Sequence, residues 1–84
     1  MTSLHIIRRS DDRFAADAVR FEEARGRVAV LLIQDGVSLD VPDLAPTYVS
    51  EPDLRARGIR SRHKTTGYEE MARLLSEYDR VVVW

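Results

Sequence analysis

The sequence predicts an α/β fold, a small three-layer α/β/α domain built on a mainly parallel sheet of four to five strands. The first observation is an unbroken run of six apolar residues, Val28–Ile33, which lacks the alternation of a strand with one wet face. The second is that strand-like segments alternate with helical ones along the whole chain. A chain of 84 residues accommodates one domain, which we place at residues 1–84.

The first third of the chain is expected to form a strand, a helix and the central strand. Residues 4–8 predict a short strand, and Ser10 is a candidate N-cap for a helix that extends to about Arg25. The buried face of that helix is expected to carry Phe14, Ala18 and Phe21 together with Ala15 and Val19. Gly26 suits the position after the helix, and Val28–Ile33 is predicted to lie between two other strands.

The middle of the chain is expected to contain a short link, a strand and a short helix. The segment from Gly36 to Thr47 is barely long enough for a parallel crossover, so we expect a single helical turn or an irregular link. Residues 47–49 predict a third strand. The helix that follows has start and stop signals at Ser50, Pro52, Asp53 and Gly58.

The last third of the chain predicts a weak strand, a helix and a terminal strand. Residues 63–65 form the weak strand, and Thr66 with Glu69 fits a capping box. The apolar face of the next helix is predicted at Tyr68, Met71, Ala72 and Leu75. Val81–Trp84 predicts a strand at the end of the sequence.

The composition excludes several classes of function. The sequence has no cysteine, which excludes disulfides, thiolate nucleophiles, persulfide carriage and zinc–thiolate sites. We therefore expect no sulfur transfer from a cysteine desulfurase onto this chain. A net charge of −1 gives no argument for nucleic acid or an anionic membrane, and no run approaches the roughly 20 apolar residues of a membrane span. We expect a cytoplasmic protein without a signal peptide, and, because its core is small, at least a dimer.

Motifs that would identify an enzyme are absent from the sequence. It contains no Walker A, GxGxxG or GxSxG pattern, and His5 and His63 have no neighbours at the spacing of metal ligands. We predict no catalytic residue, no metal site and no cofactor.

Three polar or turn residues, Gln34, Asp35 and Gly36, directly follow the central strand. One interpretation is that they form a turn and cap the next segment. The other is a contact with a ligand or partner, because such contacts usually lie at the carboxyl ends of parallel strands. Both interpretations remain open at this point.

Charge is segregated in the second half of the chain. Residues 35–53 include five acids and no Lys or Arg, whereas residues 55–64 include five Lys or Arg and no acid. Such runs form solvated surface, or a patch for RNA or an acidic partner, with Arg55, Arg57 and Arg60 as the candidate contacts. The basic run lacks aromatic residues for base stacking, which disfavours direct nucleic-acid binding. Opposite patches would steer association, so we expect it to weaken with salt or when these three arginines are replaced by Glu.

Five segments resemble the DsrH/TusB family of sulfur-relay proteins, in the same order: LHIIRRS, LLIQDGV, APTYVSEPDLRARGI, GYEEMARLL and the final Trp. The resemblance spans nearly the whole chain. It implies a small parallel-sheet α/β fold similar to DsrE and DsrF, a DsrEFH-like domain. It also implies one of three subunits in a hexamer that passes persulfide sulfur, either to the tRNA wobble 2-thiouridine or in sulfur oxidation.

Two features depart from the family pattern. The segment after Val37 is shorter than the family's crossover helix, and the cysteine of many DsrH-type members is missing. The resemblance therefore implies a non-catalytic subunit that is bound to DsrE/DsrF-like (TusD/TusC-like) partners or to itself. The alternative is a free-standing small α/β protein that binds a ligand or another protein, with a homodimer as one form it can take.

Overall fold

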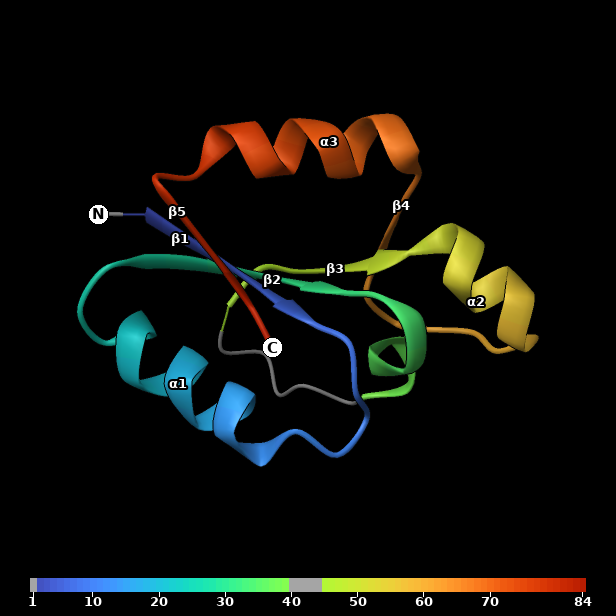
Figure 1. The fold of residues 1–84 in the computed structure, drawn as a ribbon, viewed down its shortest axis with the longest axis horizontal. Helices are drawn as coiled ribbons and strands as arrows, with labels where there is room; N and C mark the ends of the chain where they lie inside the picture. The colour runs from blue at the N-terminus through green and yellow to red at the C-terminus, as the bar shows by residue number, and fades with distance from the viewer. Residues whose placement is uncertain (1, 40–44) are drawn as a thin grey trace.

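The computed structural model describes residues 2–39 and 45–84. Five parallel strands form one sheet in the order β4-β3-β2-β1-β5, with helices on both faces (Figure 1). The elements in chain order are β1 (Thr2–Ile7), α1 (Arg13–Glu23), β2 (Arg27–Leu32), the 3-10 helix η1 (Gln34–Ser38), β3 (Thr47–Ser50), α2 (Glu51–Arg57), β4 (Lys64–Thr66), α3 (Tyr68–Glu77) and β5 (Arg80–Val83). The predicted α/β class with a parallel sheet is confirmed.

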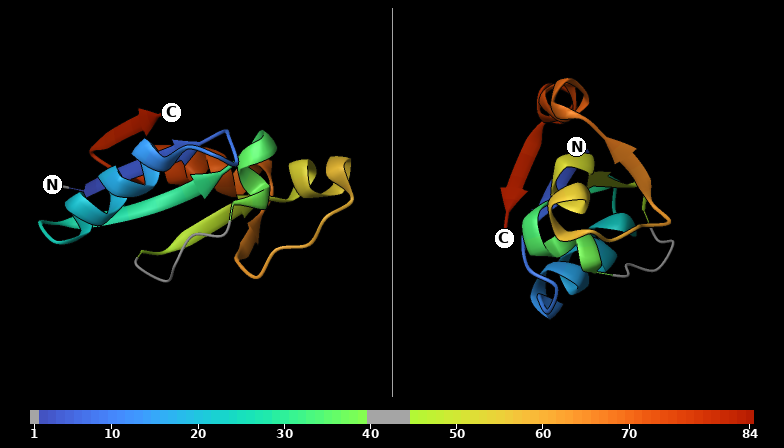
Figure 2. Two further views of the ribbon diagram at one scale, coloured as in Figure 1. Left: turned by 90° about the horizontal axis from the view of Figure 1, so that it is seen from below. Right: turned by 90° about the vertical axis from the view of Figure 1, so that its right-hand side faces the viewer.

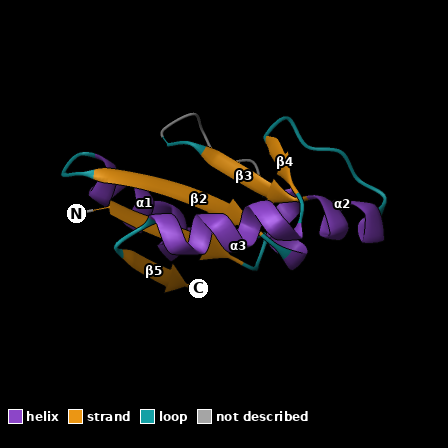
Figure 3. Cartoon of the chain, turned by 90° about the horizontal axis from the view of Figure 1, so that it is seen from above, coloured by secondary structure: helices purple, strands orange, loops and turns teal. Residues whose placement is uncertain are grey.

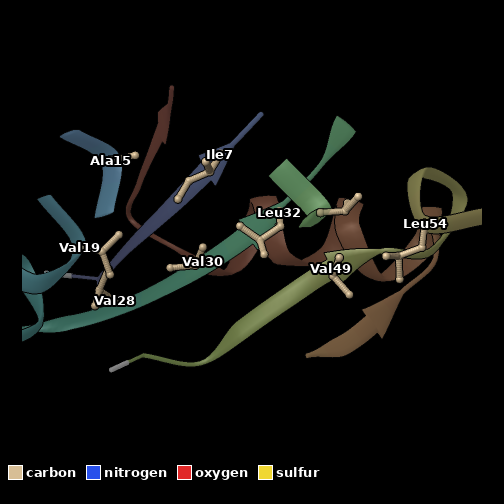
Figure 4. Packing of buried hydrophobic residues seen from close by; sticks show 9 residues of the cluster. Ile7, Ala15, Val19, Val28, Val30, Leu32, Val49 and Leu54 are labelled. Carbon is tan, nitrogen blue, oxygen red and sulfur yellow. The ribbon is translucent and has the colours of Figure 1, made fainter. Parts of the chain in front are cut away.

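Strand β2 lies at the centre of the sheet and is buried on both faces. On one face, its side chains pack with those of α1 and with Leu54 of α2 (Figure 4). On the other face, Ala29 and Leu31 pack with Leu74 of α3. The views of the ribbon show α1 and α3 on opposite sides of the sheet (Figure 2, Figure 3). The continuous apolar run of the central strand is explained by this double coverage.

The chain fills the sheet from β1 to β4 in one direction and then reverses. From β2 to β3 it passes through η1, as expected of a short link, although part of that link lies outside the described residues. Helix α3 then carries the chain back across the sheet to β5, which pairs with β1. Strands β4 and β5 therefore form the two edges of the sheet.

The helix caps are partly as predicted. Ser50 caps α2 through its side chain, and Gly58 ends that helix with a left-handed backbone, φ 62°. Helix α1 is capped by Asp12, which accepts a hydrogen bond from the backbone of Ala15, so the assignment to Ser10 is wrong. The expected capping box at Thr66 is also wrong, because the Thr66 hydroxyl donates instead to the carbonyl oxygen of Val49 in the neighbouring strand.

The predicted buried face of α1 is wrong. Phe14 and Phe21 are 81% and 59% exposed, whereas Ala15 and Val19 are buried against the sheet. The helix is turned so that its smaller side chains meet the sheet and Glu22 reaches it as well. The two aromatic rings consequently lie on an exposed flank of the helix.

Helix α3 differs from its prediction in the same way. Leu74 is the buried residue of this helix, and Met71 is half-buried beside it. Tyr68 and Leu75, which the apolar spacing placed on the buried face, are exposed. Both helices therefore present apolar flanks that the sheet does not cover.

Candidate functional site

The carboxyl end of β2 lies very close to the end of β1 at Gly36. The backbone N–H of Gly36 donates to the carbonyl of Arg8 at 3.0 Å, and that of Ile33 donates to Ile7 at 3.0 Å. A Cβ atom at position 36 would lie 2.2 Å from the carbonyl oxygen of Ile7. Position 36 therefore requires glycine because of this close approach to backbone, not because of its φ.

Gln34 adopts a left-handed backbone with φ 52°, which no other non-glycine residue in the described ranges does. Such a conformation costs about 1–3 kcal/mol and persists only where the surroundings impose it. Here the imposed turn begins η1, directly after the central strand. Strained residues cluster at functional sites, so this turn is a candidate site on physical grounds.

The side chain of Arg57 joins two acids at this edge of the sheet. Its Nε donates to Oδ1 of Asp35 at 3.0 Å, and its Nη1 lies 3.3 Å from Oδ1 of Asp53. Arg55 pairs with Glu51 one turn earlier in the same helix. The opposite charges of the acidic and basic runs are thus partly paired within one molecule.

Asp53 is the most enclosed acid of this group. Its partial burial raises the pKa, but hydrogen bonds from Ser50 and from the backbone of Gln34, with the charge of Arg57, outweigh burial and lower the pKa below its usual value. The carboxylate therefore stays ionised and fixes the start of α2 against the turn at Gln34. This role is structural, since the groups that hold the carboxylate, on Ser50, Gln34 and Arg57, all belong to the same chain.

A cavity of about 440 Å³ adjoins this turn. Its lining residues are Val37, Ser38, Leu39, Ile59, Arg60, Ser61, Arg62 and His63. Arg60, the third candidate arginine, therefore lies in the cavity wall and apart from the ion pairs of Arg55 and Arg57. Of the candidates from the sequence, Gln34, Asp35, Gly36 and Arg57 are brought together, whereas Arg55 pairs with Glu51 and Arg60 lies in the cavity wall.

A second polar cluster joins three elements that are distant in sequence. His5 of β1 is 1% exposed, and its Nε2 lies 2.8 Å from Oε2 of Glu22 in α1. The indole Nε1–H of Trp84 donates to Nδ1 of His5 at 3.0 Å, and Arg80 of β5 pairs with Glu22. This cluster has no signal in the sequence, because no local spacing relates residues up to 79 positions apart.

The cluster determines the tautomer of His5. Indole nitrogen can only donate, so Nδ1 of His5 must accept and Nε2 must carry the proton that is donated to Glu22. Both ring nitrogens of His5 are therefore occupied by partners within the same chain. His5 ties Trp84 and α1 to the sheet and has no lone pair left for catalysis.

Glu22 is kept ionised by this cluster. Partial burial raises its pKa, but hydrogen bonds from His5 and Arg80, together with the charge of Arg80, outweigh burial and lower the pKa below its usual value. Arg80, the charged residue of β5, is in turn neutralised by Glu22.

The exposed apolar flank of α1 faces β5. Phe14 and Phe21 share one stripe of the helix with Ala18, which is one turn from Glu22 on the same side. Glu22 reaches across to Arg80 in β5, so this stripe lies on the β5 side of the helix. Arg25 lies 4.3 Å from the centroid of the Phe21 ring.

The exposed apolar flank of α3 also faces β5. One flank of α3, which carries Glu70, Arg73 and Glu77, lines a depression together with side chains of β3 and β4. This flank therefore faces β4. Tyr68 and Leu75 lie on the opposite flank and therefore toward β5. Figure 2 shows β5 at the open edge of the sheet, between α3 and α1.

These flanks and β5 together form one surface, which we call the β5 edge. It comprises the six large apolar side chains that are exposed in the described part of the chain: Phe14, Phe21, Tyr68, Leu75, Val81 and Val83. The gathering of every such residue along one edge of the sheet had no signal in the sequence, since it depends on how the helices are turned.

The described residues contain no cluster of three or more His, Asp or Glu side chains that could hold a metal ion. Within the same ranges, no helix has the length and apolar character needed to cross a membrane. Comparison of the sequence with protein-family models and with curated proteins gave no match, so the DsrH/TusB resemblance stays a prediction.

Proposed function

We propose that this chain is an interaction subunit that binds an apolar β-strand of another subunit along the β5 edge. The observation that supports this most is the position of the six large apolar side chains that are exposed among the described residues, all of which lie along one sheet edge. Contiguous exposed apolar surface of this kind marks an interaction site. An open strand also offers unpaired N–H and C=O groups that a partner strand can pair.

The contrast between the two edges of the sheet supports the choice of β5. The edge strand β4 has three residues and carries Lys64, whose Nζ lies 5.8 Å from the centroid of the Tyr48 ring. Short strands and lysines are the usual protection of an edge that must not pair. Three of the four residues of β5 are valines, and its one charge, on Arg80, is neutralised by Glu22. The fold therefore protects one edge and leaves the other open.

The finer proposal is that the assembly is a cytoplasmic sulfur relay of the DsrEFH/TusBCD type. It is supported by the resemblance and by the absence of cysteine, since a thiol-free subunit has to leave the persulfide to DsrE/DsrF-like partners. In this proposal the chain contributes shape and contacts to tRNA thiolation or sulfur oxidation. The turn from Gln34 to Gly36 and the wall at Arg60 are then the candidate contacts with those partners.

The test compares one substitution on each edge. Val83→Lys places a charge on the β5 edge, and Thr65→Lys places the same charge at an exposed position of β4. Sedimentation velocity is run on the chain alone and with a cysteine-bearing DsrE-like protein. We expect the parent chain and Thr65→Lys to associate and Val83→Lys to be monomeric. Equal association of the two variants would contradict the proposal. A parent chain that stays monomeric both alone and with the DsrE-like protein would also contradict it.

The left-handed Gln34 begins the 3-10 helix η1, whose other end lines the cavity, and this favours one second candidate, a ligand-binding protein with its site at this turn. Arg60 in the cavity wall makes an anion the matching ligand class. Titration with inorganic phosphate, followed by amide chemical shifts, should then perturb residues 34–36 selectively. Unchanged shifts at these three amides would remove this candidate.

A further inference from the structure

The backbone of β5 presents alternate residues to β1 and to the outside. Trp84 donates its backbone N–H to the carbonyl of Ile6 at 2.9 Å, and β5 pairs with β1 in the register that places Val82 beside His5. Since the N–H and C=O of one strand residue point to the same side, Val82 and Trp84 bond to β1. The N–H and C=O groups of Val81 and Val83 therefore point outward along the open edge.

We propose that the strand bound at this edge is β5 of a second copy of this chain, antiparallel to the first, around a two-fold axis at Val82. The inference rests on the proposed function and names its partner. In this register Val81 and Val83 exchange their outward hydrogen bonds with Val83 and Val81 of the second copy. Val82 faces Val82 of the second copy in the closer, non-hydrogen-bonded type of pair.

The segment Arg80–Trp84 is complementary to itself in this register. Arg80 lies opposite Trp84 of the second copy, and both side chains are on the α1 face, where one bonds to Glu22 and the other to His5. A guanidinium opposite an indole gives a cation–π pair, which the two-fold axis repeats. Valine lies opposite valine at the remaining positions, a favourable cross-strand combination.

Charge also permits the approach of two identical edges. The only ionised side chain in β5 is that of Arg80, and its ion pair with Glu22 removes the repulsion between the two copies. Strand β5 itself therefore brings no unbalanced charge to the approach.

The neighbouring register toward the start of β5 is less favourable. An axis at Val81 would place Val83 opposite Asp79 of the second copy. The backbone N–H of Asp79 already donates to the hydroxyl of Thr2 at 3.0 Å, so it could not bond to Val83. The register around Val82 pairs both outward residues with groups that have no bond within the described chain.

The apolar flanks of the helices complete the surface on both faces of the joined sheets. Phe14 and Phe21 lie beside the seam on one face, and Tyr68 and Leu75 lie beside it on the other. In each helix the two residues are seven positions apart with an alanine between them, Ala18 or Ala72. The large side chains lie at similar distances before and after the alanine. The spacing of large side chains along the stripe is therefore nearly the same when the stripe is reversed in an antiparallel copy.

The absence of cysteine allows a clean cross-linking test. Val82→Cys is expected to form a covalent dimer under mild oxidation, because Cα atoms in a non-hydrogen-bonded pair are about 4.5 Å apart, within the range of a disulfide. Val81→Cys serves as the register control. In the proposed register residue 81 lies opposite residue 83 of the second copy, so the two introduced sulfurs are offset along the strands. Thr65→Cys on the β4 edge is the exposure control. The readout is the fraction of dimer on a non-reducing gel over time, with sedimentation of the parent chain alone.

The outcomes separate this inference from the proposed function. Rapid dimer formation by Val82→Cys, with at least tenfold slower formation by both controls, supports the two-fold pairing. If the parent chain is monomeric alone but binds a DsrE-like protein through the β5 edge, the proposal that the partner is a second copy is wrong. The proposal that the chain is an interaction subunit is then supported. If sedimentation shows a dimer but Val82→Cys does not cross-link faster than the controls, the proposed register with its axis at Val82 is wrong. A monomer under every condition contradicts both.

Discussion

Gly36 is the residue on which the turn after the central strand depends most. Its amide bonds to Arg8 while its α-carbon lies against the carbonyl of Ile7, so the turn and the end of β1 are in direct backbone contact. The interpretation of residues 34–36 as a turn accounts for this glycine. It does not account for the left-handed Gln34, which the sequence could not reveal because glutamine has no preference for that conformation.

Gly36→Ala should destabilise the fold by at least about 2 kcal/mol, because the added methyl group meets backbone that cannot move aside cheaply. Gly67→Ala is the matched control, since a Cβ there would have no neighbour within 4 Å. We expect the control to cost less than about 1 kcal/mol, as for a change at an N-cap. Urea unfolding gives both values, and equal stability of the two variants would rule out the close approach.

Glu22 should make the fold sensitive to acid. Its pKa in the folded chain is lowered, despite the opposing effect of partial burial, by hydrogen bonds from His5 and Arg80. The folded state therefore binds this proton less readily than the unfolded state, and Glu22 stabilises the fold fully only above its unfolded pKa. As the pH falls through the folded pKa, this contribution is lost.

Glu22→Gln should lower the free energy of unfolding near neutral pH and reduce its further loss in acid. Glu23→Gln is the control, because Glu23 makes no ion pair within the described residues. Urea unfolding at about pH 7 and about pH 3 provides the comparison. An unchanged acid dependence in Glu22→Gln would show that the cluster does not determine it.

At the scale of elements, the sequence predicts the existence of each helix better than its orientation. In α1 the stripes Phe14–Ala18–Phe21 and Ala15–Val19–Glu22 have the same spacing, so periodicity alone cannot choose between them. The choice depends on His5, a distant residue that only the folded sheet places opposite Glu22. The central strand, by contrast, was identifiable from its continuous apolar run, and α2 from its local capping residues.

The orientation of α1 predicts an inverted order of mutational effects. Val19→Ala should cost about 1–2 kcal/mol of stability, because Val19 is 1% exposed and its removal leaves a cavity. Phe14→Ala removes a larger side chain but should change the stability of the monomer by less than about 0.5 kcal/mol. Thermal unfolding at low protein concentration measures both. A larger loss for Phe14→Ala would contradict the exposed position of its ring.

At the scale of the molecule, the two edges of the sheet differ, and association is expected at β5 rather than at β4. The sequence predicted a parallel sheet and an oligomer, but it placed the contacts on the charged runs rather than on β5. Arg55 and Arg57 are paired within the chain. Glu51 lies one turn before Arg55 in the same helix, whereas Asp35 is brought to Arg57 only by the fold. Reversal of these arginines to Glu would therefore first break ion pairs of the same chain.

Amide hydrogen exchange of β5, measured residue by residue at several protein concentrations, shows whether the β5 edge pairs with another strand in solution. The amides of Val82 and Trp84 bond to β1 and should be protected at every concentration. Those of Val81 and Val83 point outward and should become protected only as the concentration rises and the edges pair. Outward amides that exchange rapidly at all concentrations, with or without a DsrE-like protein, would contradict the claim that the β5 edge is a binding surface.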